Sequence, residues 1–209
     1  MSKPGRVEPV RILVLVSGNG TTLQALIHAE RQGGLPGGRI QAVIADREGA
    51  YALERAKTAG IPVYTLGQQD LSDRILYHAR QEGADLIILG GLLSILGGDL
   101  IREYQGRMIN LHPSLLPKFG GPGMYGERVH RAVLASGETE SGCTVHLVDA
   151  GIDTGPILLQ RRVPVLPGDT PVGLAARVHQ AEHRAIVDAA ALLVSRIREV
   201  PAGSSVFFP

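Results

Sequence analysis

Short apolar runs alternate with longer amphipathic segments along most of the chain. Runs rich in β-branched residues predict strands over Val10–Val16, Ile40–Ala45, Val63–Leu66, Leu86–Leu89, Met108–Leu111, Thr144–Val148 and Ile157–Val163. Apolar positions three and four residues apart predict helices over Thr22–Glu30, Ala50–Ala59, Leu71–Gln81, Gly126–Ala135 and Val172–Ile197. The early strands are almost continuously apolar, as expected when helices cover both faces of a parallel sheet. The pattern therefore predicts an α/β fold, a three-layer sandwich around a mostly parallel sheet of about seven strands.

No low-complexity linker or internal repeat divides the chain, and its Gly-Gly and Pro-Gly pairs mark turns. We expect a single domain over residues 1–209. The tail Ala202–Pro209 is expected to lie at the surface.

The composition is that of an ordinary soluble protein, with 44% hydrophobic and 20% charged residues. The 21 Lys and Arg residues balance 20 Asp and Glu residues without a basic block, which argues against binding to nucleic acid or to an anionic membrane. The composition remains compatible with small-molecule substrates, including anionic ones. Cys143 has no second cysteine for an intrachain disulfide, and neither a usual signal peptide nor a membrane-spanning run is evident. We expect a cytoplasmic protein.

The apolar run that begins at Met108 ends in two polar side chains. Asn110 and His112 lie two residues apart, and alternate residues of a strand project from the same face. Pro113 favours an extended backbone at His112, and Pro117 ends the following loop. An amide beside an imidazole suits acyl transfer, because one group can stabilise a developing oxyanion while the other moves a proton. In isolation the pair also fits a strand end that is hydrogen-bonded to its own loop.

The glycine-rich turn Ser17–Gln24 joins the first strand to the first helix. Its glycines let backbone amides approach an anion, and the helix N-terminus adds partial positive charge, so the turn predicts a phosphate site. It lacks the ending of a P-loop, and Leu23 replaces the third glycine of the dinucleotide fingerprint. We therefore expect no nicotinamide cofactor, although Asp46 ends the second strand where a ribose contact could lie. The alternative is a tight turn capped by Thr21 or Thr22.

A second candidate site follows the sixth predicted strand. One face of this strand presents Thr144, His146 and Val148. Two glycines flank Asp153 in the loop that comes next, which can hold a carboxylate over a pocket. Such a carboxylate would orient His112 and raise its proton affinity, or else Asp153 is a turn residue bonded to its own backbone. A metal site of His112, His146 and Asp153 would lack every common ligand spacing.

Several of these segments together closely resemble the phosphoribosylglycinamide formyltransferase family, folate-dependent enzymes of purine synthesis. The resemblance covers about residues 10–190 and is carried by Ser17–Gln24, Asn110–Pro117, Gly142–His146, Asp153–Pro156 and Gln180–His183. It implies a formyltransferase-like fold with a phosphate-binding half at about 10–100 and a catalytic half at about 101–195. It also implies formyl transfer from 10-formyltetrahydrofolate, as co-substrate, to the amine of glycinamide ribonucleotide, without a metal.

The resemblance implies roles for individual residues. The catalytic positions correspond to Asn110, His112 and Asp153. The positions that bind the phosphate and ribose of the ribonucleotide correspond to Gly18, Asn19, Gly20, Thr21, Thr22 and Glu182. The positions that line the folate pocket correspond to Leu93, Ser94, Ile95, Leu96, Asn110 and Val148. Ordinary core packing is an equally simple interpretation of the apolar residues in that last set.

Some features depart from the family pattern. Thr22 stands where the family commonly has Asn, the segment Gly67–Arg74 is short and gives no secure match to a binding Arg, and Lys118–Tyr125 is unusually glycine-rich. Two other functions stay open: a formyltetrahydrofolate hydrolase or another formyltransferase of the same fold, and a non-enzymatic nucleotide-binding module. The chain length leaves no room for the extra domain of the hydrolase or of the methionyl-tRNA enzyme. A homodimer is compatible with the sequence.

Overall fold

The computed structural model describes residues 8–199, so the predicted surface position of the tail Ala202–Pro209 lies outside it. These residues form a seven-stranded sheet in the order β3-β2-β1-β4-β5-β6-β7. The strands are β1 (Val10–Val16), β2 (Gly38–Ala45), β3 (Val63–Thr65), β4 (Leu86–Leu89), β5 (Met108–His112), β6 (Glu140–Leu147) and β7 (Ile157–Pro164). The helices are α1 (Thr21–Arg31), α2 (Tyr51–Thr58), α3 (Leu71–Gln81), α4 (Gly98–Glu103), α5 (Glu127–Ala135) and α6 (Pro171–Glu199).

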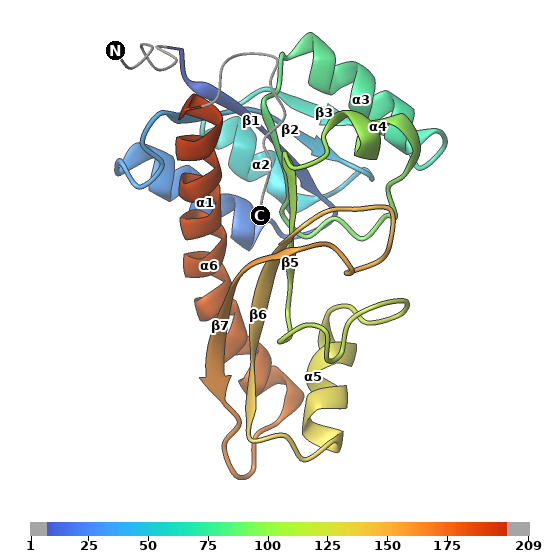
Figure 1. The fold of residues 1–209 in the computed structure, drawn as a ribbon, viewed down its shortest axis with the longest axis vertical. Coiled ribbons are helices and arrows are strands. Elements are labelled where there is room, and N and C mark those ends of the chain that lie inside the picture. Colours follow the sequence, from blue (N-terminus) through green and yellow to red (C-terminus); the bar gives the residue numbers. More distant parts are fainter. Residues whose placement is uncertain (1–7, 200–209) are drawn as a thin grey trace.

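The first five strands run parallel to one another, and β6 and β7 add two antiparallel pairings. Strands β5, β6 and β7 extend beyond the parallel part, with α5 beside their far end and α6 alongside them (Figure 1). The predicted α/β fold with a mostly parallel sheet is confirmed.

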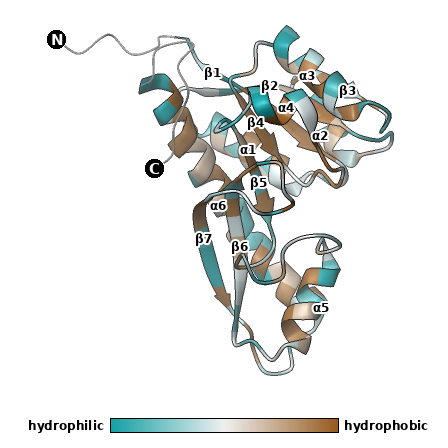
Figure 2. Cartoon of the chain, turned by 45° about the vertical axis from the view of Figure 1, so that its right-hand side comes forward, coloured by the Kyte–Doolittle hydropathy of each residue, from teal (hydrophilic) through white to brown (hydrophobic). Residues whose placement is uncertain are grey.

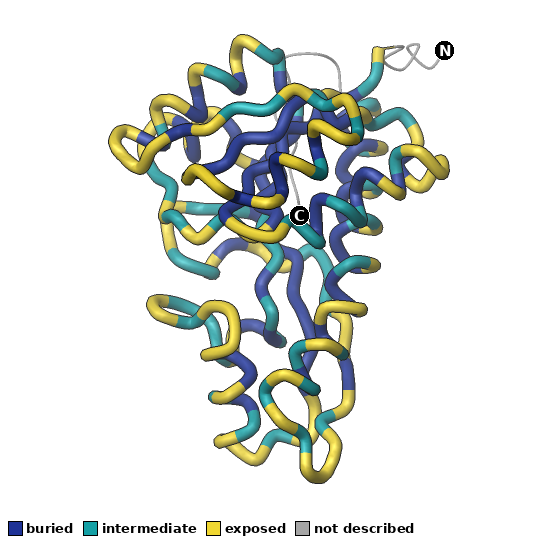
Figure 3. Tube along the Cα trace, turned by 180° about the vertical axis from the view of Figure 1, so that it is seen from behind, coloured by how far each residue is buried: buried dark blue, intermediate teal, exposed yellow. Residues whose placement is uncertain are grey.

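Two apolar clusters hold helices to opposite faces of the sheet. Alternate residues of β1, including Ile12 and Val14, pack with α1, α2 and α6, whereas Leu13 and Leu15 face α3 and α4. Hydrophobic residues concentrate on the central strands, and the same strands are buried (Figures 2 and 3). The continuous apolar character of β1 thus has the expected cause, because both of its faces are covered by helices.

The strand order reverses next to β1, which pairs with β2 on one side and with β4 on the other. In open α/β sheets, ligands bind in the crevice beyond the carboxyl ends of the strands at such a point. The chain segments that leave β1 and β4 are in contact there, since the amide of Ser17 donates to the carbonyl of Gly91 at 3.2 Å. Because β5 pairs with β4, its end carries His112 to the same edge of the sheet. The topology therefore places both sequence motifs at one edge of the sheet.

The helix α4 was not predicted from the sequence. It has six residues and begins at Gly98, directly after Gly97, so it is too short to show an amphipathic period. Leu100 and Ile101 are its buried residues, and its main helical neighbour is α3. Short helices depend on tertiary packing for stability, which explains why local sequence does not indicate this one.

The strand predicted to begin at Thr144 begins at Glu140 instead. Gly142 interrupts the apolar pattern, and a Cβ at this position would come within 2.0 Å of the carbonyl oxygen of Arg161. Glycine is therefore required by the close approach of β7 and does not mark a turn. At its other end β6 stops at Leu147, so the prediction that Val148 belongs to the strand is wrong.

Candidate active site

Three predicted catalytic side chains meet at the end of β5. Asn110 and His112 come from alternate positions of the strand, and Asp153 comes from the loop after β6. Oδ2 of Asp153 lies 3.3 Å from Nδ1 of His112, and its Oδ1 lies 3.4 Å from Nδ2 of Asn110. The side chains of His112 and Asp153 are 5% and 10% exposed. The structure therefore brings the three residues into one mostly buried cluster.

The loop that presents Asp153 is folded by its neighbours. Asp149 accepts hydrogen bonds from the amide of Gly151 at 3.0 Å and from the hydroxyl of Thr154 at 2.7 Å. A Cβ at Gly155 would come within 1.8 Å of the carbonyl oxygen of Leu147, so this position must be glycine. The predicted sharp turn is confirmed.

Asp153 does not have the role of a turn residue. Its φ of 58° is left-handed, an uncommon conformation for a residue other than glycine. Its carboxylate accepts a hydrogen bond from the amide of Gly121 at 3.0 Å, in the glycine-rich loop after β5. The interpretation that Asp153 bonds to its own backbone is wrong, and Asp149 makes those bonds instead.

Both ring nitrogens of His112 face hydrogen-bond acceptors. Nε2 lies 2.8 Å from the carbonyl oxygen of Phe119, and Nδ1 faces Asp153. Only the imidazolium form can donate at both positions. Burial nevertheless lowers the pKa of His112, and it outweighs the opposing effects of Asp153 and of the Phe119 carbonyl. The expectation that Asp153 keeps His112 charged therefore holds only in part: the geometry suits the charged ring, while burial opposes it.

The carboxyl of Asp153 is favoured in its ionised form. Burial raises its pKa, but the nearby His146 and His112 side chains and the hydrogen bond from the amide of Gly121 together bring the pKa below its usual value. An anionic Asp153 favours a positive charge on the neighbouring His112. The imidazole ring is therefore the group that accepts a proton released in the cluster.

His146 belongs to the same cluster, although the predicted catalytic set did not include it. Its Nε2 lies 3.1 Å from Nδ2 of Asn110 and 3.6 Å from Oδ1 of Asp153. Its Nδ1 donates to the carbonyl oxygen of Leu147 at 2.8 Å, which leaves Nε2 to accept from Asn110. The antiparallel pairing of Asn110 with His146 creates this contact, and the sequence does not reveal that register.

Backbone amides at the start of α1 are available to a ligand. The helix has no side-chain cap and no acidic residue in its first turn, so the alternative interpretation, a turn capped by Thr21 or Thr22, is wrong. Thr22 is only 9% exposed, and its position offers no amide of the kind the family commonly has there. The uncapped N-terminus favours anion binding over a purely structural turn.

The two glycines of this turn have different constraints. Gly20 has φ 75°, and a Cβ there would lie 2.5 Å from the Cβ of Ala52 on α2. A Cβ at Gly18 would have no atom within 4 Å. Gly20 is therefore required by packing, whereas Gly18 borders open space that a ligand can use.

Arg55 on α2 fixes the middle of the turn, which the sequence did not indicate. Its Nε donates to the carbonyl of Asn19 at 2.8 Å, and its Nη2 donates to the Asn19 side-chain oxygen at 3.0 Å. Its Nη1 donates to Gln24 at 3.1 Å. The guanidinium group also adds a positive charge next to the predicted phosphate site.

The segment after β4 that was predicted to line the folate pocket is anchored to the glycine turn. The amide of Leu93 donates to Oγ of Ser17 at 2.8 Å, and the hydroxyl of Ser94 donates to Asp46 at 2.6 Å. Asp46 is 1% exposed and also binds Arg47. This internal use of Asp46 leaves no free carboxylate for the ribose contact of a nicotinamide cofactor.

The apolar side chains of this segment are largely exposed. Leu93 is 54% and Ile95 is 76% exposed, so the interpretation of these two residues as ordinary core is wrong. Leu96 and Val148 pack at the edge of the apolar cluster that contains α3 and α4. Exposed aliphatic side chains beside the glycine turn are available to an apolar ligand surface.

One predicted ribonucleotide-binding residue lies apart from the cluster. Glu182 lies on α6, and within the described residues no hydrogen bond or ion pair joins it to Asn110, His112 or Asp153. Its side chain is 10% exposed, Nδ1 of His179 lies 3.6 Å away, and burial raises the pKa of Glu182 to about 7. The short segment Gly67–Arg74, which gave no secure match to a binding Arg, ends in Arg74, an exposed residue of α3.

Over residues 8–199, no group of three His, Cys, Asp or Glu side chains is arranged to hold a metal ion. The cluster itself supplies an amide donor, a histidine that can change protonation state and an anionic carboxylate.

Comparison with known proteins points in the same direction. The chain is 46% identical over 203 residues to the trifunctional purine biosynthetic protein adenosine-3 of Drosophila pseudoobscura pseudoobscura, covering 91% of this chain and 14% of that protein. It is 40% identical over 180 residues to the phosphoribosylglycinamide formyltransferase of Escherichia coli (strain K12), covering 83% of this chain and 82% of the relative.

A similar structure has also been solved. The crystal structure of glycinamide ribonucleotide transformylase 1 from Symbiobacterium toebii matches with a TM-score of 0.85 and 39% identity, covering 91% of this chain and 90% of that one. The family model described as formyl transferase matches residues 10–190. These findings confirm the resemblance indicated by the motifs, and the chain belongs to the formyl transferase family.

Proposed function

We propose that the chain transfers the formyl group of 10-formyltetrahydrofolate to the amine of glycinamide ribonucleotide, a step of purine synthesis. The observation that carries the proposal is the cluster of Asn110, His112 and Asp153, which lies at the same edge of the sheet as the uncapped glycine turn. Relatives that align along most of the chain are named for this reaction.

The reaction needs one bond made, one bond broken and one proton moved. The ribonucleotide amine attacks the formyl carbon to form a C–N bond and a tetrahedral intermediate with an oxyanion. The bond from that carbon to N10 of the folate then breaks. A proton leaves the attacking nitrogen, and one reaches N10, so neither a metal nor a covalent enzyme intermediate is required.

Asn110 and protonated His112 stabilise the oxyanion in this proposal. One such donor typically contributes about 3 kcal/mol, or roughly 10²- to 10³-fold in rate. The 3.4 Å contact of the Asn110 amide with Asp153 is longer than its contact with His146, so it is the one that an oxyanion would replace.

Asp153 and His112 handle the proton. Because burial lowers the pKa of His112 in the free protein, its charged form becomes favourable only when negative charge develops beside it. Stabilisation that appears with the oxyanion lowers the barrier without tightening the ground state. Proton transfer by a positioned group is typically worth about 10²- to 10⁴-fold.

The substrates are proposed to bind on two sides of this cluster. The phosphate of the ribonucleotide occupies the open space beside Gly18, near the α1 N-terminus and Arg55, with Asn19, Gly20, Thr21 and Thr22 completing the turn. The pterin of the folate packs against Leu93 and Ile95. Glu182 is proposed to contact the ribose, which requires the bound ribonucleotide to extend to α6.

A single assay separates this proposal from its rivals. Purified protein would be incubated with both substrates and the products identified. Formation of the formylated ribonucleotide and of tetrahydrofolate in equal amounts would support the proposal. Formate released without formylated amide would indicate a hydrolase, and binding without turnover would indicate a nucleotide-binding module.

Formyl transfer is expected to proceed without ATP or added metal. The glycine turn lacks the features of a P-loop, and the cluster supplies its own oxyanion donors. Initial rates would be measured after dialysis against EDTA, with and without magnesium or zinc. Loss of activity on chelation that zinc restores would contradict the prediction.

Replacing Gly18 with Ala is expected to raise the Michaelis constant for the ribonucleotide by about tenfold and to leave that for the folate unchanged. The added methyl group enters open space in the free protein, so the fold is retained while the phosphate loses its close backbone approach. The same change at Gly20 would also disturb packing against Ala52 and is less informative.

A matched control is Gly173→Ala, in the first turn of α6, where a Cβ meets only atoms at 3.4 Å or beyond. Steady-state kinetics with each substrate varied in turn would compare the two variants. Equal increases in both Michaelis constants for Gly18→Ala would argue against this turn as the phosphate site.

None of the helices in the described part of the chain combines the length and apolar character needed to cross a membrane. Action on small molecules in the cytoplasm, without nucleic acid or membrane, is part of the proposal. A homodimer stays a prediction.

A further inference from the structure

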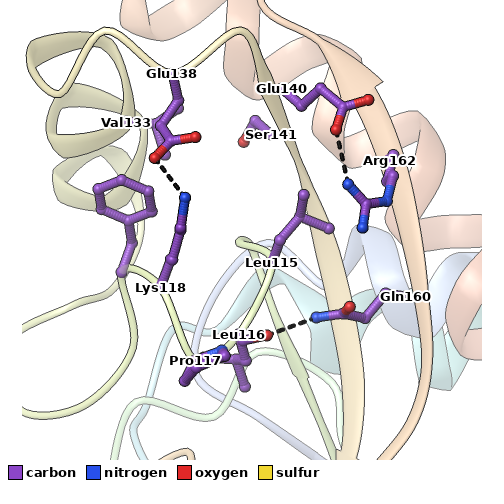
Figure 4. A pocket seen from close by; sticks show the side chains of 11 residues that line it. Leu115, Leu116, Pro117, Lys118, Val133, Glu138, Glu140, Ser141, Gln160 and Arg162 are labelled. Carbon is purple, nitrogen blue, oxygen red and sulfur yellow. Dashed lines mark hydrogen bonds and ion pairs between the residues drawn. The ribbon is translucent and has the colours of Figure 1, made fainter.

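A cavity lies behind the segment that links β5 to α5, and the proposed reaction makes no use of it. Its volume is about 300 Å³. It opens between this segment, α5 and the adjoining parts of β6 and β7 (Figure 4). Its lining includes Leu115, Phe119, Val133, Ser141, Gln160 and Arg162.

One polar group in the lining has no partner. Ser141 is 1% exposed, and within residues 8–199 its hydroxyl makes no hydrogen bond. In Figure 4 this side chain lies between Val133 and Leu115 on the wall of the cavity. A buried hydroxyl without a partner is costly, by about 1–3 kcal/mol, and is rare in native proteins. A ligand with a hydrogen-bonding group would satisfy it.

Two ion pairs flank the cavity, so positive and negative charges are equal in number there. Lys118 pairs with Glu138 on one side, and Arg162 pairs with Glu140 on the other, each with a nitrogen to oxygen distance of 2.7 Å (Figure 4). Because every cation already has a carboxylate beside it, a simple anion such as phosphate gains little here. An α-amino acid zwitterion can place its carboxylate at the cation and its ammonium group at the carboxylate of one of these pairs, while its side chain reaches the apolar wall.

The remaining walls are apolar. Leu115, Val133 and Phe119 provide aliphatic and aromatic surface between the two ion pairs. A volume of 300 Å³ corresponds to roughly ten water molecules, so a compound of about ten non-hydrogen atoms can fill the cavity. We propose that this cavity is a second binding site, for a free amino acid with an apolar side chain.

The cavity is directly connected to the catalytic cluster. Phe119 lines it, and the carbonyl of the same residue lies 2.8 Å from Nε2 of His112. The hydroxyl of Ser114 donates to the neighbouring Lys118 carbonyl at 2.6 Å, which ties the segment to the base of β5. An occupant that contacts Phe119 therefore acts on the hydrogen-bond partner of His112 and changes turnover. This effect on turnover rests on the proposed function, whereas binding does not.

Binding would be tested by NMR titration of the complete chain with L-leucine and L-phenylalanine. Saturable shifts of the Ser141 and Phe119 amide signals are expected, with a dissociation constant in the millimolar range or below. N-acetyl-L-leucinamide, which carries neither charge, is expected to bind at least about tenfold more weakly. Equal affinity for this neutral analogue, or no saturable binding of either amino acid, would overturn the proposal.

Ser141→Ala is the decisive variant, and it is expected to weaken binding by about three- to tenfold. Since the hydroxyl has no partner in the free protein, the variant should fold at least as stably as the wild type. Ser136→Ala is the matched control, because its hydroxyl donates to the Val133 carbonyl and the residue does not line the cavity. Unchanged binding in Ser141→Ala would overturn the site.

Kinetics would then test the connection to His112. Saturating L-leucine is expected to alter kcat of formyl transfer at least twofold in the wild type and to have a smaller effect at the same concentration in Ser141→Ala. Binding without any change in kcat would overturn the connection through Phe119. Failure of the proposed function is distinguishable, since it would abolish formyl transfer with or without the amino acid and leave the NMR titration unaffected.

Discussion

Asp153→Asn is expected to lower kcat by at least about 100-fold while both substrates still bind. The change removes the negative charge that lies 3.3 Å from Nδ1 of His112 and opposes the lowering of its pKa by burial. Asn preserves the shape of the side chain and tolerates the left-handed φ of 58°. The substitution should therefore reduce kcat and leave folding intact.

The pH dependence provides a second readout. Without the carboxylate, the pKa of His112 falls further, so the imidazolium form is populated only in more acidic solution. The limb of the kcat profile that reports loss of the imidazolium should move to lower pH in the variant. Stopped-time assays across a pH series would measure it alongside both Michaelis constants.

Asp149→Asn is the matched control in the same loop. An amide oxygen can still accept from the Gly151 amide and the Thr154 hydroxyl, and over residues 8–199 no hydrogen bond or ion pair joins Asp149 to His112. Its turnover should stay within about threefold of the wild type. If Asp153→Asn instead turned over at nearly the wild-type rate with intact folding, the proposed proton route would be wrong.

Glu182→Gln is expected to stabilise the protein at pH 8 by about 3 kcal/mol and to have little effect at pH 4.5. Burial raises the pKa of Glu182 from 4.5 to about 7. Between these values the folded state holds a proton that the unfolded state has released, so the free energy of unfolding falls as pH rises. Above pH 7 the folded protein carries the full cost of the buried charge.

The surroundings of Glu182 do not offset this cost. His179 lies 3.6 Å away, but burial lowers the pKa of His179, so the ring supplies no positive charge at pH 8. Gln keeps the shape and a hydrogen-bonding group and removes the charge. The proposed contact of Glu182 with the ribose predicts that the Michaelis constant for the ribonucleotide rises in Glu182→Gln. The variant would then gain stability and lose substrate affinity, a trade-off expected at functional sites.

Urea unfolding at pH 4.5, 6, 7 and 8 would test the stability prediction. Glu127→Gln is the control, since Glu127 is exposed and pairs with Arg131 on the surface of α5. That variant should differ from the wild type by less than about 0.5 kcal/mol at every pH where both fold. An identical pH dependence in Glu182→Gln and the wild type would contradict the buried-charge account.

Much of the local structure was accessible from the sequence because its signals are themselves local. Strand β1 was predicted with its observed limits, since an uninterrupted apolar run has one simple explanation in a parallel sheet. The spacing of Asn110 and His112 predicted a shared strand face, and paired glycines predicted the sharp loop around Asp153. Element type, side-chain face and turn position are all properties of neighbouring residues.

The partners of those residues were decided by tertiary structure alone. His146 faces Asn110 because β6 runs antiparallel to β5 in one particular register, and Arg55 reaches Asn19 from a separate helix. Nothing in the sequence indicates that the carbonyl of Phe119 will accept a hydrogen bond from His112. The sequence by itself determined which chemical groups exist and which way each strand face points. The crossovers and strand register decided which groups meet, because those contacts join residues distant along the chain.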